Sequence, residues 1–205
     1  TVNNITYSDQ VVDSPTNNFA TWNPISNTGL AALSEGNLKY NPAGTSSSTG
    51  MRGTIGVNSG KWYFETLRVA VGAGYHTGIS GMSGPTRKSS TLYAGTYYYG
   101  DNNADQGLGA GSNGDIVSCA FDLDNNKIWF AKNGVWHSAA SGTPNPATGA
   151  VPTDTLTSGL EEVTAWTEHS NASYAGTVTH NFGQDSSFAG NKTAQGNQDG
   201  NDIGD

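Results

Sequence analysis

The segment Gly114-Asp-Ile-Val-Ser-Cys-Ala-Phe-Asp-Leu-Asp-Asn-Asn-Lys-Ile-Trp-Phe-Ala-Lys-Asn-Gly-Val-Trp136 is the most regular part of the 205-residue chain and decides its fold. Two runs rich in β-branched and aromatic residues, 116–123 and 127–131, flank the pair Asn125-Asn126. Asparagine tolerates the positive φ angles that a two-residue hairpin turn needs. The sequence therefore predicts two antiparallel strands joined by a tight turn.

This turn predicts a register and hence two faces for the hairpin. The expected pairs are Leu123 with Ile128, Phe121 with Phe130, Asp122 with Trp129, Ala120 with Ala131 and Asp124 with Lys127. One face is then apolar and includes Cys119, which we interpret as a core residue.

The rest of the chain adds short strands separated by turn residues. A second turn at Lys132–Gly134 continues the hairpin, and the aromatic run Gly60–Val69 has apolar side chains at both parities, as a central buried strand does. Further strands are expected at 37–40, around Ile79, at 90–99, at 162–166 and at 176–182. The pattern predicts an all-β fold, an antiparallel sandwich or barrel, with a long connection at 137–160.

Charge and composition narrow the function. Lysine and arginine number 9 against 17 aspartate and glutamate residues, which gives a net charge of −8. A nucleic acid or an anionic membrane requires a basic face, so neither is an expected partner. The chain has one cysteine and therefore no intrachain disulfide, and no apolar run reaches the length of a membrane span.

Two motifs, in order along the chain, resemble the hallmark strands of SPRY domains. The first is Gly60-Lys-Trp-Tyr-Phe-Glu65, and the second is the opening segment 114–136 with its cysteine, Asp-Leu-Asp and Lys-Asn-Gly. Three further stretches are similar to the SPRY-like modules of bacteriophage structural proteins, namely Asp13–Pro24, Lys132–Trp136 and Asn181–Gln184. The resemblance covers about residues 13–190.

The resemblance implies a two-sheet antiparallel β-sandwich, a concanavalin-like jelly roll, whose long end loops bind protein or peptide without catalysis. We expect an N-terminal arm with a first strand at 1–18, the sandwich at 19–190 and a Gly-, Asn- and Asp-rich tail at 191–205. The tail cannot bury itself, so we expect a partner chain to hold it. An apolar closing segment usually follows such a tail in these relatives, so we expect the chain to be a piece of a longer protein.

No pattern of residues assigns a reaction. The glycine-rich run Gly109–Gly114 precedes a strand, whereas a dinucleotide site needs a helix there. The histidines lack short metal-ligand spacing; they are His76, His137, His169 and His180. His180 shares its parity with apolar neighbours and is interpreted as a buried, hydrogen-bonded side chain.

Calcium is the only cofactor with a partial signal. The run Asp101–Gly107 has the oxygen spacing of a calcium loop but lacks the glutamate at its twelfth position. The tail offers similar oxygens at Asp199, Asp202 and Asp205. Both are interpreted as ordinary turns, so no cofactor is expected.

Aromatic residues in or beside the predicted loops are the candidate binding residues. They are Tyr97, Tyr98, Tyr99, Trp136 and Trp166. Such rings give rigid contact area to protein partners and also stack on sugars.

These observations predict a non-enzymatic module on the surface of a bacteriophage virion, as a capsid decoration, a fibre or tail component, or a host-attachment device. The expected partners are other virion subunits, including copies of the same chain, and a host-surface protein or glycan. Two alternatives stay open. One is a carbohydrate-binding module, and the other is a sandwich-fold polysaccharide-degrading enzyme whose paired carboxylates come from Glu161, Glu162 and Glu168.

Overall fold

The computed structural model describes residues 18–26, 31–42, 49–70, 74–81, 87–93, 96–99, 104–138, 140–156, 162–169, 176–198 and 204. For Thr49, 87–93, 96–99, 104–110 and His169 it describes the backbone alone. Within these residues the chain forms β-strands and one short 3-10 helix, η2 (Pro24–Ser26), and no α-helix. No helix in the described part is long and apolar enough to cross a membrane.

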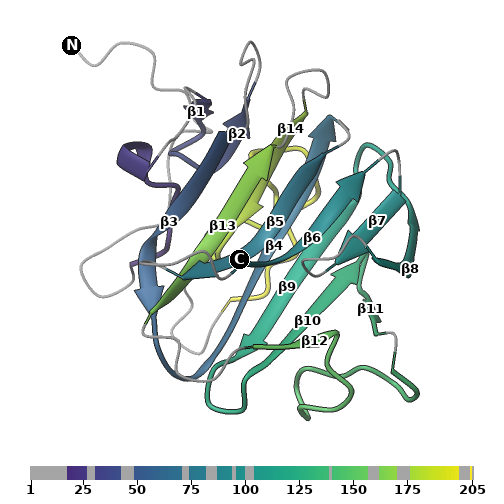
Figure 1. The fold of residues 1–205 in the computed structure, drawn as a ribbon. Helices are drawn as coiled ribbons and strands as arrows, with labels where there is room; N and C mark the ends of the chain where they lie inside the picture. Colours follow the sequence, from purple (N-terminus) through teal and green to yellow (C-terminus); the bar gives the residue numbers. More distant parts are fainter. Residues whose placement is uncertain are drawn as a thin grey trace, which may run out of the picture.

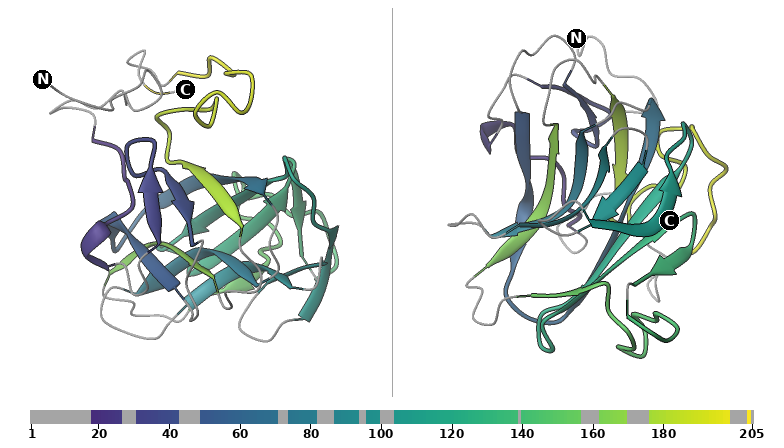
Figure 2. Two further views of the ribbon diagram at one scale, coloured as in Figure 1. Left: turned by 90° about the horizontal axis from the view of Figure 1, so that it is seen from above. Right: turned by 45° about the vertical axis from the view of Figure 1, so that its right-hand side comes forward.

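The strands form two antiparallel sheets packed face to face (Figures 1 and 2). The larger sheet has the order β1 (Ala32–Ser34), β2 (Lys39–Asn41), β14 (Thr177–Asn181), β4 (Lys61–Ala70), β9 (Ile116–Asp122), β10 (Lys127–Lys132) and β11 (Val135–His137), and β12 (Asp154–Thr155) also pairs with β10. The smaller sheet has the order β3 (Thr49–Val57), β13 (Val163–His169), β5 (Tyr75–Gly81), β6 (Arg87–Tyr93), β7 (Thr96–Tyr99) and β8 (Ala104–Ala110). The predicted two-sheet antiparallel sandwich is confirmed.

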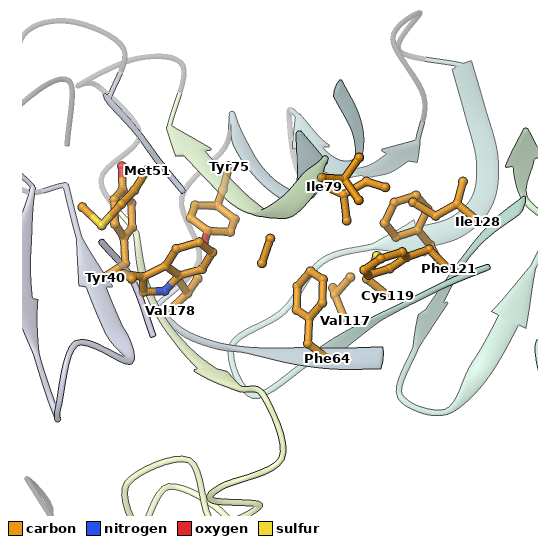
Figure 3. Close-up of a cluster of buried hydrophobic side chains, with 14 of the residues drawn as sticks. Tyr40, Met51, Phe64, Tyr75, Ile79, Val117, Cys119, Phe121, Ile128 and Val178 are labelled. Carbon is orange, nitrogen blue, oxygen red and sulfur yellow. The ribbon is translucent and has the colours of Figure 1, made fainter. Parts of the chain in front are cut away.

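The hydrophobic core lies between the two sheets (Figure 3). Alternate residues of β9, Val117, Cys119 and Phe121, face Met51, Tyr75 and Ile79 of the smaller sheet across this core, and all are buried. Cys119 is fully buried, and burial raises the pKa of its thiol well above the ordinary value. Its interpretation as a core residue is confirmed.

The segment before β1 closes one side of the core through Trp22. This residue forms an isolated bridge with Gly53 of β3, and its indole Nε1 donates a hydrogen bond of 3.0 Å to Nδ1 of His180 in β14. Both side chains are 0% exposed. His180 is therefore buried and hydrogen-bonded, as its position in the sequence predicted.

The predicted register of the β9–β10 hairpin is wrong, although the predicted faces are right. Lys127 pairs with Asp122, Ile128 with Phe121 and Phe130 with Cys119, so the pairing is shifted by two residues and the turn spans four residues, 123–126. Only Asn126 in this turn has a positive φ, 54°. A shift of two residues keeps every side chain on its face, because side chains alternate with period two.

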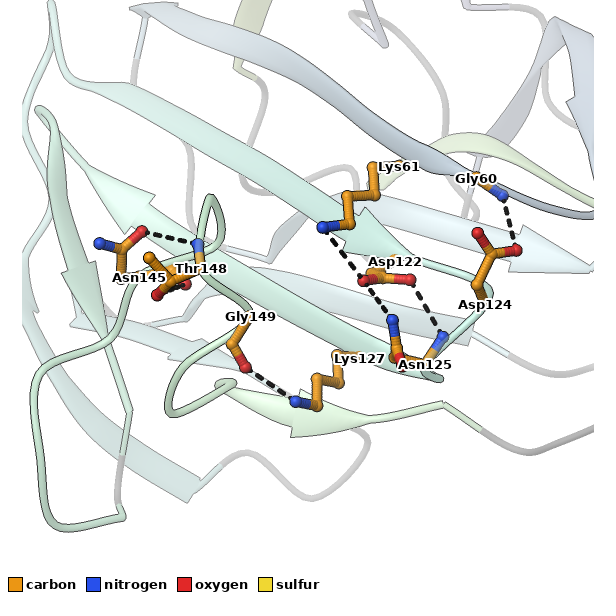
Figure 4. A network of polar contacts seen from close by, with 9 residues as sticks. All are labelled: Gly60, Lys61, Asp122, Asp124, Asn125, Lys127, Asn145, Thr148 and Gly149. Carbon is orange, nitrogen blue, oxygen red and sulfur yellow. Dashed lines mark hydrogen bonds and ion pairs between the residues drawn. The ribbon is translucent and has the colours of Figure 1, made fainter.

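The wider turn is held by the side chain of Asp122. Its carboxylate accepts hydrogen bonds from the backbone N–H of Asn125 at 3.0 Å and from the side-chain amide of Asn125 at 2.9 Å (Figure 4). A two-residue turn at Asn125-Asn126 would forgo these charge-assisted bonds. The second turn, in contrast, matches its prediction: Lys132 pairs with Val135, and Asn133 and Gly134 have φ angles of 49° and 79°, as a two-residue hairpin turn requires.

Loss of this carboxylate should weaken the hairpin. We expect Asp122→Ala to lower the free energy of unfolding by about 1.5–3 kcal/mol, the usual contribution of hydrogen bonds to a charged group. Urea unfolding at pH 7 measures the effect. Asp122→Asn keeps an acceptor for the backbone N–H of Asn125 and should lose less, and equal losses in the two variants would contradict the role given to the charge.

Several other segments differ from expectation. Strand β8 begins at Ala104, within the run Asp101–Gly107 that was interpreted as an ordinary turn. Strand β3 was not predicted, because Gly50, Gly53 and Gly56 lower its strand propensity; Gly53 is needed there, since a Cβ would lie 2.9 Å from Oγ1 of Thr164. Residues 90–99 belong to two strands, β6 and β7, instead of one. The connection after β11 contains β12, and an isolated bridge joins Asn145 to Ala150.

Candidate functional site

The outer face of the larger sheet carries a trough with a floor of small side chains. Residues of β4, β9, β10 and β11 stand in rows across the sheet: Lys61, Asp122 and Lys127; then Tyr63, Ala120 and Trp129; then Glu65, Ser118, Ala131 and Trp136. Ala120, Ser118 and Ala131 occupy the middle of these rows. Large rings to either side therefore enclose a low floor.

Two aromatic rings form the edge of the trough. Tyr63 is 50% exposed, Trp136 is half-buried, and their ring centroids are 6.3 Å apart at an interplanar angle of 60°. The Tyr63 hydroxyl donates to the Glu65 carboxylate and lies 3.1 Å from Oγ of Ser118. Burial, reinforced by the hydrogen bond to Glu65, raises the pKa of Tyr63 above its ordinary value, so its hydroxyl stays a donor.

The segment between β11 and β12 folds over the outer face and builds one wall of the trough. Two side chains of β10 hold it. Nζ of Lys127 donates to the carbonyl of Gly149 at 2.8 Å (Figure 4). Nε1 of Trp129 donates to the carbonyl of Ala150 at 2.9 Å. Oδ1 of Asn145 accepts a hydrogen bond from the N–H of Thr148. The wall is thus fixed by the sheet before any ligand arrives.

A cavity of about 380 Å³ lies between the aromatic rings and this wall. Its lining includes Tyr63, Trp136, Ala120 and the stretch 145–147. The volume falls in the range of known small-molecule sites.

A charged pair closes one end of this cavity. Nζ of Lys61 lies 3.8 Å from Oδ2 of Asp122, and the Lys61 side chain is 59% exposed whereas that of Asp122 is 3% exposed (Figure 4). Burial alone raises the pKa of Asp122, but its hydrogen bonds with Asn125 and the charge of Lys61 outweigh that effect and lower it. The carboxylate is therefore committed to the turn, while the Lys61 ammonium remains accessible to a ligand.

The trough continues past Tyr63 into a second cavity of about 840 Å³ under the C-terminal segment. Figure 2 shows this segment outside the larger sheet. It is tied back by two hydrogen bonds, from Nζ of Lys192 to the carbonyl of Gly114 at 2.7 Å and from the N–H of Gln195 to Oγ of Ser186 at 2.8 Å. Residues 191–198 of the predicted tail are exposed, so the expected partner chain for the tail stays a prediction.

Two of the five sequence-predicted binding residues have side chains in the described part of the structure, and one of these two lies at this site. Trp136 lines it. Trp166 lies in β13, between β3 and β5, and is 4% exposed, so it was wrongly placed beside a loop and has no surface to offer a partner. Tyr97, Tyr98 and Tyr99 belong to β7. Only their backbone is described, and their side chains lie outside the described part of the structure.

Tyr63, Lys61 and Asn145 were missed as candidate binding residues. The strand containing Tyr63 was interpreted as buried on both faces, because apolar residues occur at both parities. The missing signal was the alternation Lys61, Tyr63, Glu65, which marks an accessible face of mixed polarity.

The catalytic and metal candidates do not converge within the described residues. Glu162 and Glu168 are separated by six residues along an extended segment, about 20 Å, whereas paired glycosidase carboxylates lie about 5–9.5 Å apart. Glu161 lies outside the described residues, as do the predicted calcium oxygens of Asp101, Asp199, Asp202 and Asp205. No group of three or more His, Cys, Asp or Glu in the described part could hold a metal ion.

Two solved structures with a similar architecture are SPRY domains. The SPRY domain of human HERC1 superposes with a TM-score of 0.53 at 17% identity, covering 78% of this chain and 96% of that domain. The PSpry domain of TRIM65 superposes with a TM-score of 0.56 at 14% identity, covering 79% of this chain and 91% of that domain. No family model matches the chain, and no curated protein matches it in sequence. The fold is SPRY-like, and at these identities the similarity shows the fold alone.

Proposed function

We propose that this chain is a non-enzymatic binding module of a bacteriophage particle and that it uses the trough of the larger sheet to attach to a host surface. The observation that carries the binding role is the exposed Tyr63–Trp136 pair over a floor of small residues, beside a wall that is held in place. Aromatic rings in a partly enclosed site are the usual anchors of recognition surfaces. The virion context rests on the resemblance of residues 13–24, 132–136 and 181–184 to phage modules.

The arrangement of acidic groups in the trough supports binding over hydrolysis. Glu65 and the Lys61–Asp122 pair are four residues apart along β4, about 13 Å. This separation exceeds the span over which two carboxylates act on one glycosidic bond. In addition, Asp122 is engaged by Asn125 and Lys61 and is not placed to exchange a proton.

Cell adsorption tests this function. Fluorescently labelled protein is incubated with a panel of Gram-negative and Gram-positive bacteria, and bound protein is measured by flow cytometry. We expect binding to at least one strain and a loss of about tenfold or more in the Tyr63→Ala/Trp136→Ala double variant, because the anchors of the site are removed.

The control is Ile25→Ala, which removes a fully accessible apolar side chain, 94% exposed, from η2 on a different part of the molecule. Its binding should equal that of the unmodified protein. Adsorption that survives the double variant, or no adsorption to any strain, would contradict attachment through the trough.

Assembly with other copies of the chain belongs to the same proposal. A virion component is expected to form a homo-oligomer, and light scattering coupled to size-exclusion chromatography measures its mass. A monomer at all protein concentrations would contradict the expected self-assembly but not the proposed attachment through the trough.

A further inference from the structure

We infer that the ligand of the trough is a neutral oligosaccharide that stacks on Tyr63 and Trp136 and extends past Tyr63 into the cavity under the C-terminal segment. This inference rests on the proposed binding function and specifies its ligand class. The two cavities share Tyr63 in their lining, so one extended ligand can occupy both.

The first argument is the chemistry of the first cavity. A sugar ring has an apolar face of C–H groups and an equatorial rim of hydroxyls. Tyr63 and Trp136 offer aromatic surface for the apolar face. At the rim, Nζ of Lys61 is accessible as a donor. The carboxylate of Glu65, which lines the second cavity, is an acceptor further along the same strand.

The second argument is the lining of the larger cavity. Its walls include the amide side chains of Gln195, Asn197 and Gln198. Two further amides in its lining, Asn133 and Asn181, are hydrogen-bonded to neighbouring protein groups. An amide donates and accepts hydrogen bonds at once, which matches a hydroxyl, since each hydroxyl also does both. A surface built for an apolar or highly charged ligand would present other groups.

The third argument is charge. The linings of the two cavities contain two formal positive charges, Lys61 and Lys192, and two formal negative charges, Glu65 and Asp122, while the Lys127 ammonium of the trough is bonded to the Gly149 carbonyl. The site is thus balanced, and the whole chain carries a net charge of −8. Balanced charge favours a neutral ligand, and the net charge disfavours polyanionic glycans.

The fourth argument concerns peptides, which are the main rival ligand. Extended peptides gain affinity by pairing with a free strand edge. The trough instead lies on the faces of β4, β9 and β10, each of which is already paired with a strand on both sides. Recognition there depends on side chains alone, as for a glycan.

An array of neutral oligosaccharides tests the inference. The probes are gluco-, manno-, galacto- and N-acetylglucosamine oligomers of one to six units, with sulfated and sialylated glycans on the same array. We expect binding to at least one neutral oligomer of three or more units and weaker binding of its mono- and disaccharides, because the two cavities together exceed the size of one ring.

Variants then locate the ligand by titration calorimetry. Trp136→Ala should weaken binding by about tenfold to thirtyfold, as loss of an aromatic anchor does. Gln198→Ala should weaken binding of the longer oligomers and leave the disaccharide unchanged, because it removes an amide of the second cavity alone. Ile25→Ala is the matched control and should bind as the unmodified protein does.

Three outcomes would overturn the inference: no neutral oligomer binds, only anionic glycans bind, or Trp136→Ala binds as well as the unmodified chain. Pretreatment of cells separates this failure from failure of the proposed function. One result would identify a protein ligand: adsorption depends on Tyr63 and Trp136, resists periodate oxidation of cell-surface diols, and is lost after protease treatment of the cells. The glycan inference would then be wrong, whereas the proposed binding function would stand.

Discussion

Trp22→Ala is expected to lower the free energy of unfolding by about 3–5 kcal/mol, the range for removal of a large buried aromatic side chain. Trp22 is 0% exposed, and its ring lies edge-on to His180 and Phe182, with centroid distances of 4.5 Å and 5.5 Å. The substitution also removes the hydrogen bond to Nδ1 of His180, which leaves a buried acceptor unpaired. Such a loss is a large part of the total stability of a domain, about 5–15 kcal/mol.

Urea unfolding followed by circular dichroism at pH 7 measures this change. Trp22→Phe keeps an aromatic ring but loses part of the indole and its N–H donor, so a smaller loss of about 1–3 kcal/mol is expected. Ile25→Ala, three residues away and exposed, should stay within about 0.5 kcal/mol of the unmodified protein. If Trp22→Ala were as mild as Ile25→Ala, Trp22 would not belong to the core.

Acid should destabilise the protein through His180. Burial lowers the pKa of His180 from its ordinary value of 6.5 to about 3, and the neighbouring Leu38 backbone offsets only part of that shift. Because Nδ1 accepts the hydrogen bond from Trp22, the folded ring is neutral. Above pH 6.5 the folded and unfolded states are both neutral at this residue, and its full contribution to stability is present.

As the pH falls from 6.5 toward 3, the unfolded state binds a proton that the folded state excludes. The free energy of unfolding should then fall by about 1.4 kcal/mol per pH unit, a loss of about 2 kcal/mol at pH 5 and roughly 3 kcal/mol at pH 4. Carboxylates such as Asp122, whose pKa is lowered in the folded state, act in the same direction but only at still lower pH.

The control for this prediction is His180→Gln, which offers an acceptor to Trp22 but does not titrate. Urea unfolding at pH 7, 6, 5 and 4 gives one stability curve for each protein. The two curves should converge as the pH falls. Only the unmodified chain has a residue at position 180 that binds a proton in the unfolded state, so only its free energy of unfolding falls through this residue. Parallel curves across this range would show that His180 titrates alike in the folded and unfolded states.

The β9–β10 hairpin shows which features of a strand pair the local sequence pattern can predict and which it cannot. Alternation along 116–132 correctly predicted that Cys119, Phe121, Ile128 and Phe130 face the core. The register was wrong by two residues, because the propensity of Asn125-Asn126 for a tight turn was weighed without the capping hydrogen bonds of the Asp122 carboxylate. Both registers satisfy the same alternation, so alternation could not distinguish them.

The candidate site was much less predictable than the fold. Aromatic character and proximity to a loop selected Trp136, which lines the candidate site, but the same criteria selected Trp166, which is buried in β13. Exposure of an aromatic side chain depends on what packs over its strand, and that strand neighbour comes from a distant part of the sequence.

The residue pattern predicted most of the strands and their faces, because side-chain direction alternates with each residue and burial of one face follows from local polarity. The choice of a two-sheet sandwich over a barrel came from the resemblance to SPRY domains. The trough could be identified only from the folded sheet. Its rings and floor come from β4, β9, β10 and β11, and its wall from residues 145–147, which the side chains of Lys127 and Trp129 hold over the sheet. Strand neighbours are selected by pairing across long sequence separations, so no local pattern reveals which side chains will enclose a cavity.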